Sequence, residues 1–170
     1  MRQRKRSFLF IAAALASLLP AQASAESAGY LTDRGVAFYY ALFPAEMIRG
    51  REQQEPEATM HGGPPRSRHA YHLMVALFDA ATSRRITDAE VTAKVTEVGL
   101  AGQEKKLESM AVAGAVTYGN YFTLAPNTNY RIRVTVRTPS SAEPARIEFP
   151  FKHEREARGL RNKRDKPAGK

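Results

Sequence analysis

Residues 130–137 read Tyr-Arg-Ile-Arg-Val-Thr-Val-Arg, the most regular stretch of the chain. Large apolar side chains alternate there with charged or polar ones at every step. Because successive side chains of a β-strand point to opposite faces of the sheet, this alternation predicts a strand with one buried and one hydrated face. The stretch therefore indicates a sheet whose inner face lies in a core.

Similar signals surround this stretch. Residues 71–78 are almost wholly apolar, which is typical of a strand that is central or buried on both faces. Turn residues such as Pro126-Asn127 separate the segments. Further strand candidates, all short, are residues 36–48, 91–96, 107–112, 114–124 and 147–151. About seven short strands without a convincing amphipathic helix predict an all-β, immunoglobulin-like β-sandwich.

Two segments near the start depart from the strand pattern. Residues 26–35 suggest a short irregular lead-in, and Pro44 limits residues 36–48 to an edge strand or forces a bulge. Residues 49–68 are rich in Pro, Gly and charged residues and have no periodicity. Since long loops inside compact domains are more often functional than not, we expect this loop to contribute to function.

The first 25 residues have the features of a cleavable export signal. A positive start at Arg2, Arg4, Lys5 and Arg6 precedes an apolar run over residues 8–19, and Ala23-Ser24-Ala25 supplies a cleavage site. The run is shorter than the roughly 20 residues of a spanning helix, although an uncleaved anchor remains the alternative. No Cys follows, which excludes a lipoprotein. We therefore expect a signal peptide at 1–25 and a periplasmic protein without a stable membrane span.

Charge and cysteine content limit the remaining possibilities. The chain has no Cys, so neither disulfides nor thiolate metal sites can form. Its net charge of +9 comes from the signal and from residues 152–170, since residues 26–151 carry equal numbers of acidic and basic side chains. We expect a folded domain at 26–151 and a basic, disordered tail at 152–170 that is either solvated or in contact with anionic lipid or a polyanion. A neutral domain argues against nucleic acid as partner.

No catalytic motif accompanies these features. The sequence contains no Gly-x-Ser-x-Gly turn and no phosphate-binding glycine loop. His153-Glu154 begins like a zinc-protease motif, but Ala157 stands where the second His is required. The sequence therefore predicts a protein that is not an enzyme.

Methionine and histidine are the residues of this chain whose side chains could bind a metal ion. His72 and Met74, two residues apart on one strand, share a face of the sheet. Thioether sulfur suits Cu(I), and imidazole suits copper, zinc and iron. The candidate metal ligands are His72, Met110, Met60, His61, His69 and Met74. Each has a structural alternative: the methionines as core filler, His72 as a hydrogen-bonded core residue, and Met60 and His61 as plain loop residues. His153 is expected at the rim of the sandwich.

The segments at residues 69–78 and 107–124, with His72-Leu-Met and Tyr118-Gly119-Asn120-Tyr121-Phe122, resemble the periplasmic iron-transport accessory family. Strand-like stretches at 130–136 and 146–152 continue in that family's order. The resemblance covers about 80 residues. It implies a secreted immunoglobulin-like sandwich that binds copper, forms a homodimer and accompanies an inner-membrane ferrous-iron permease. Secreted immunoglobulin-type domains of the YtkA-like kind fit the strands nearly as well.

Carried over by position, the resemblance implies that His72 and Met110 are metal ligands. Met74 replaces an acidic residue of the family, and Thr117 replaces a His. Residues 138–145 form a short turn without the family's further His. Met60, His61 or His69 would have to substitute for the two missing imidazoles, or only the scaffold remains.

Two hypotheses follow from the sequence. The first is a periplasmic metal-binding protein for copper or iron, acting in metal uptake or delivery. The second is a non-catalytic periplasmic interaction module that uses the 49–68 loop, the aromatic strand at 36–43 or the basic tail as its contact surface.

Overall fold

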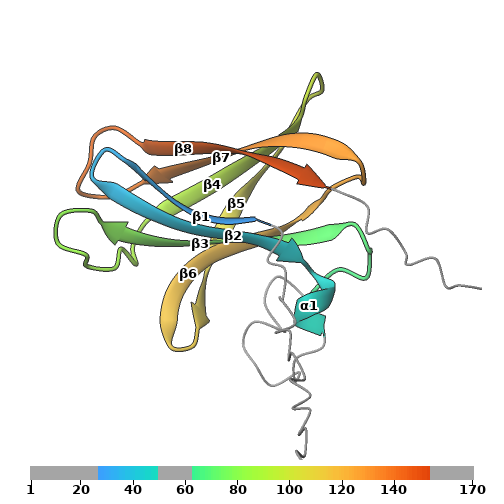
Figure 1. Ribbon diagram of the computed structural model, residues 1–170. Helices are drawn as coiled ribbons and strands as arrows, with labels where there is room; N and C mark the ends of the chain where they lie inside the picture. Colours follow the sequence, from blue (N-terminus) through green and yellow to red (C-terminus); the bar gives the residue numbers. More distant parts are fainter. Residues whose placement is uncertain (1–26, 50–62, 154–170) are drawn as a thin grey trace, which may run out of the picture.

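The computed structural model of the chain describes residues 27–49 and 63–153 (Figure 1). Apart from one short helix, the regular secondary structure of this part is β-strand. In chain order the elements are β1 (Ser27–Asp33), β2 (Val36–Pro44), α1 (Glu46–Arg49), β3 (Ala70–Asp79), β4 (Glu90–Glu97), β5 (Gln103–Val112), β6 (Ala115–Thr123), β7 (Thr128–Arg137) and β8 (Ala145–His153). The all-β fold is confirmed, with eight strands where about seven were expected. The expected signal peptide lies outside the described residues.

Every strand pairs antiparallel with its neighbour, in the order β1-β2-β3-β6-β5-β4-β7-β8. β5 belongs to both halves of this sheet, because residues 103–107 pair with β4 and residues 108–112 pair with β6. The sheet folds over at β5, so that β1, β2, β3 and β6 form one layer and β4, β7 and β8 form the other (Figure 1). The Asp33 carboxylate accepts a hydrogen bond of 2.7 Å from the backbone N–H of Arg146, which brings the two edge strands together. The result is a nearly closed sandwich.

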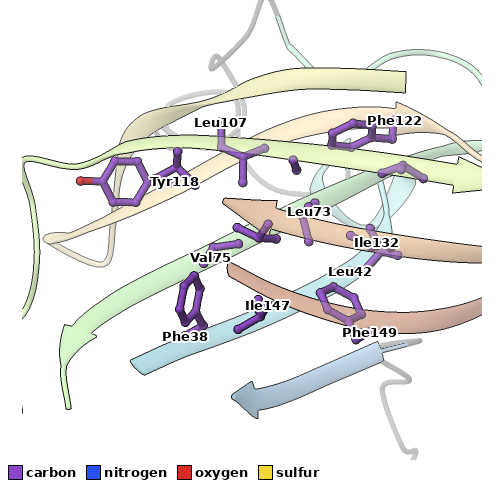
Figure 2. Packing of buried hydrophobic residues seen from close by; sticks show 14 of the residues in the cluster. Phe38, Leu42, Leu73, Val75, Leu107, Tyr118, Phe122, Ile132, Ile147 and Phe149 are labelled. Atoms are coloured by element: carbon purple, nitrogen blue, oxygen red, sulfur yellow. The ribbon is translucent and has the colours of Figure 1, made fainter. Parts of the chain in front are cut away.

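One hydrophobic core fills the space between the layers (Figure 2). Ile132 and Val134 of β7 are fully buried, whereas Arg131 and Arg133 between them are exposed, as the alternation predicts. Other strands contribute the large buried side chains that Figure 2 labels: Phe38, Leu42, Leu73, Val75, Leu107, Tyr118, Phe122, Ile147 and Phe149. Because these residues occupy the inner faces of the strands, the polar and chemically active residues between them are directed to the outer faces.

The structure corrects two expectations at the start of the domain. Residues 27–33 are not an irregular lead-in but the edge strand β1, which pairs along its whole length with β2. Its tight turn uses Arg34 and Gly35, both at positive φ, a conformation that suits a two-residue hairpin. β2 is not an edge strand, since β1 and β3 flank it. Pro44 ends β2 at its last residue, where the chain turns into α1, and so limits the length of the strand.

The last strand of the domain is longer than the stretch that the sequence predicts. β8 continues to His153, two residues beyond the predicted end, and His153 is buried and not at an exposed rim. The basic tail beyond it lies outside the described residues. Within residues 27–49 and 63–153, no helix has the length and hydropathy of a membrane span.

Candidate metal centre

The candidate ligands of β3 and β5 lie on the outer face of one layer. On β3 the residues Tyr71, Leu73, Val75 and Leu77 point into the core, so His72 and Met74 point away from it. The strand register extends this outer face across the sheet, because paired residues of antiparallel strands share a face. Met74 lies opposite Gly119 of β6, and Thr117 of β6 lies opposite Met110 of β5. Three neighbouring strands therefore contribute to one surface.

Gly119 forms a hollow on this surface. A Cβ atom placed on Gly119 would come within 2.8 Å of His72 Nε2 and 3.0 Å of the Leu73 carbonyl oxygen, and would overlap the Met110 methyl group. The imidazole from β3 and the thioether from β5 thus converge over the same glycine from opposite sides. Only a residue without a side chain leaves room for both.

Aromatic rings enclose the imidazole of this pair. His72 is fully buried and Met110 is 5% exposed. The Tyr121 ring stacks on His72 with centroids 4.5 Å apart, and the Phe43 ring meets it edge-on at 5.5 Å. Burial raises the pKa of the Tyr121 phenol above its ordinary value, so the ring stays neutral at physiological pH. The two described rings packed against His72 are therefore aromatic and neutral.

Thr117 adds a polar atom beside Met110. Its side chain is 8% exposed. Within the residues that the structure describes, its hydroxyl has no hydrogen-bond partner. Buried hydroxyls normally have a partner, so the burial of this oxygen carries a cost in stability that no hydrogen bond among the described residues offsets.

His69 does not join His72. It lies just before β3 and its ring is 6.2 Å from that of His153, which also contacts Tyr71 on the inner side of the sheet. His69 Nε2 accepts a hydrogen bond of 3.2 Å from Arg68 Nε. His153 Nδ1 lies 3.1 and 3.0 Å from the carbonyl oxygens of residues 124 and 125. The two histidines therefore form a separate pair at one end of the sandwich.

The remaining candidates, Met60 and His61, lie outside the described residues. Among residues 27–49 and 63–153, no group of three or more His, Asp or Glu side chains could hold a metal ion. A metal on the described outer face would consequently depend on thioether sulfur as well as on His72.

Sequence reasoning missed the two residues that shape the candidate site, Gly119 and Tyr121. The signal for both was present in the Tyr-Gly-Asn-Tyr-Phe stretch, where a glycine interrupts an aromatic strand. Glycine inside a strand often marks a close approach of other groups, and Gly119 fits that description.

The architecture defines a class, an antiparallel β-sandwich with a nearly continuous eight-stranded sheet. No family model and no curated protein sequence matches the chain. Solved structures do match it, and they show which proteins share this architecture.

A DUF4426 family protein from Pseudomonas aeruginosa PAO1 matches with a TM-score of 0.56 at 15% identity, over 75% of this chain and 94% of that one. A copper-bound variant of FetP from uropathogenic Escherichia coli strain F11 matches with a TM-score of 0.54 at 15% identity, over 74% and 93%. A copper-bound variant of Campylobacter jejuni P19 gives 0.52 at 11%, over 74% and 97%. The resemblance inferred from the sequence is thereby confirmed for the fold.

Proposed function

We propose that the chain is an exported copper-binding protein that acts in metal uptake or delivery. The observation that carries this proposal is the convergence of His72 Nε2 and the Met110 thioether over Gly119. Two solved structures with the same fold, variants of FetP and P19, are copper-bound, which supports copper as the metal.

The donor chemistry favours copper over iron. Thioether sulfur is a soft ligand that selects copper, whereas Fe(II) sites usually include carboxylate oxygen. In this proposal His72 and Met110 would hold the ion, with Met74 on the same face. The bound copper would serve as cargo, and the apolar rings of Phe43 and Tyr121 would keep water from the imidazole.

The cellular setting follows from the signal-like residues 1–25 and from the family resemblance. We propose the periplasm as the location, an inner-membrane metal permease as the partner and a homodimer as the working form. Iron uptake is the process that the resemblance implies, and the copper proposal is independent of it.

Equilibrium dialysis of the apo-protein, residues 26–170, against Cu(I), Cu(II) and Fe(II) tests the proposal. We expect one copper ion per chain at micromolar free copper or below. His72→Ala should abolish this binding, and His69→Ala is the matched control because His69 belongs to the other histidine pair. Absence of copper binding, or equal binding by His72→Ala, would overturn the proposal.

A second candidate function, a non-catalytic interaction module, is favoured by an exposed aromatic row on the same layer. Tyr30 and Tyr39 are 52% and 51% exposed, their rings are 4.8 Å apart, and Phe78 continues the row 5.4 Å from Tyr39. Exposed apolar patches of this kind often mark protein contacts. A partner that co-purifies with the protein in the presence of chelators, and is lost in Tyr39→Lys, would support this function.

A further inference from the structure

We infer that the outer-face site selects Cu(I) over Cu(II), with Met74 as a second thioether ligand and Gly119 as the residue that makes room for the ion. This inference rests on the proposed copper-binding function. It concerns the oxidation state that the site accepts, which the fold and its neighbours leave open.

The outer face around Gly119 is rich in soft donors. The side chains that reach this face from β3 and β5 near the glycine include one imidazole, His72, and two thioethers, Met74 and Met110. Sulfur and imidazole donors suit Cu(I), while Cu(II) favours nitrogen and oxygen ligands in a tetragonal arrangement. One imidazole with two thioethers therefore matches Cu(I).

Met74 has space to reach the hollow at Gly119. Its Cα pairs with Ala41 of β2 on one side and with Gly119 of β6 on the other. Both neighbours are small, so the long, unbranched Met74 side chain has room to lie across the face. It is half-buried, and the Gly119 hollow where His72 and Met110 converge is directly beside it.

The burial of His72 also favours an ion of low charge. His72 is fully buried, and its ring lies between Tyr121 and Phe43. The cost of moving an ion from water into apolar surroundings rises steeply with its charge. A singly charged ion is therefore favoured at this position over a doubly charged one, in the same direction as the donor chemistry.

One hard donor shares the face and must be considered. Glu108 of β5 pairs in register with Gly119, on the side opposite Met74. Its side chain is exposed, unlike those of His72 and Met110. A solvent-exposed carboxylate is poorly placed to complete a buried site, so we assign Glu108 no role in holding Cu(I).

Gly119 determines whether the site can form. The atoms that a Cβ there would meet belong to two of the proposed ligands and to the β3 backbone. Gly119→Ala would fill the space in which the imidazole and the sulfur approach each other. Gly29→Ala in β1 is a matched control, because the three atoms nearest to its added methyl all belong to the Tyr40 side chain and to none of the proposed ligands.

Competition of the apo-protein with a Cu(I) chelator under reducing, anaerobic conditions and with a Cu(II) chelator in air tests the inference. We expect Cu(I) to bind at least about 100-fold more tightly than Cu(II). Met74→Leu and Gly119→Ala should each weaken Cu(I) binding by about tenfold or more, the scale of loss typical even for residues that only support a metal ligand. X-ray absorption of the Cu(I) form should show two sulfur neighbours, reduced to one by Met74→Leu.

Two control variants and a folding check distinguish failure of this inference from failure of the proposed function. Met47→Leu, an exposed methionine of α1, and Glu108→Gln should leave Cu(I) affinity unchanged. Urea unfolding of Gly119→Ala checks that the variant folds, and Met74→Leu tests the inference if it does not. Equal Cu(I) and Cu(II) affinities, or a requirement for Glu108, would overturn the inference and leave copper binding intact. If neither oxidation state binds, the proposed function itself fails.

Discussion

Gly119 and Thr117 lie two residues apart on the outer face of β6, and both are unusual residues for a buried position of a strand. Gly119 lacks a side chain, and the space is taken by groups from β3 and β5. Thr117 lacks, among the described residues, a hydrogen-bond partner for its buried hydroxyl. A strand selected for stability alone would favour larger, better satisfied residues at both places, which is consistent with a functional surface.

Thr117→Val tests the cost of the buried hydroxyl. Valine has nearly the same shape as threonine. It removes a hydroxyl that is buried away from water and has no hydrogen-bond partner among the described residues. We expect the free energy of unfolding to rise by about 1 kcal/mol, measured by urea denaturation of the apo-protein. Cu(I) affinity should not change, since a neutral hydroxyl is a poor ligand for a soft ion. A destabilised variant would show that the hydroxyl is satisfied after all.

At the scale of single elements, the loop between β3 and β4 is fixed by one carboxylate. Asp79 Oδ1 accepts hydrogen bonds of 2.7 Å from both the hydroxyl and the N–H of Thr82, and one of 3.2 Å from the N–H of Ala81. The Thr82 hydroxyl, followed by its N–H, holds the pKa of Asp79 below its ordinary value. The charged form of the carboxylate therefore stabilises the end of β3.

The pH dependence of this loop follows from the direction of the shift. Because the folded-state pKa is lowered, the stabilisation is present above the unfolded-state pKa of about 3.9 and is lost as the pH falls through the lower folded-state value. Thr82→Val should raise the pKa of Asp79 toward the ordinary range, as followed by carboxyl carbon NMR. Thr96→Val, a threonine of β4, is the control and should leave this titration unchanged.

The sequence predicts strands well where their two faces differ and poorly where they do not. β7 and β8 alternate so regularly that Ile132 and Phe149 could be assigned to the core directly. β1 carried no such signal, because as an edge strand it buries little on either face. Its existence depends on pairing with β2 and on the Arg34-Gly35 turn, which is tertiary information that a short apolar pattern does not carry.

The candidate site, too, was only partly predictable from the sequence. His72 and Met74 could be placed on one face from their spacing alone. The meeting of His72 with Met110 depends on the β3–β6–β5 pairing, a register that no local pattern fixes. The positions of His69 and His153 required the structure too, because their pairing joins the start of β3 to the end of β8.

At the scale of the whole molecule, the layer that carries the candidate metal site presents exposed aromatic side chains on its outer face. Tyr30, Tyr39 and Phe78 form a row beside the small residues Ala37 and Ala76 and line a cavity of about 390 Å³. The Arg85 guanidinium lies 4.5 Å above the Phe78 ring and borders the same cavity. The opposite layer instead presents charged residues such as Arg131 and Glu148, which form an ion pair. One layer therefore presents aromatic side chains on its outer face, and the other presents charged ones.

This asymmetry predicts how the proposed homodimer is assembled. A two-fold dimer pairs the same patch from each copy, so the aromatic row would be buried against its own counterpart. Tyr39→Lys would place two charges in that interface, one from each chain, and should convert the dimer to a monomer in light scattering of the full-length mature protein. Leu100→Lys is the matched control, since Leu100 is 62% exposed but lies between β4 and β5, away from the row.

Copper affinity, under the proposed function, gives the dimer prediction a second readout. His72 is buried within one chain by Phe43 and Tyr121, which belong to that chain. Cu(I) affinity of Tyr39→Lys should therefore equal that of the unaltered protein even when the dimer is lost. A monomeric unaltered protein at tens of micromolar would contradict the dimer, and a dimer that survives Tyr39→Lys would place the interface on another surface. Loss of Cu(I) binding together with the dimer would show that the second chain helps to form the site.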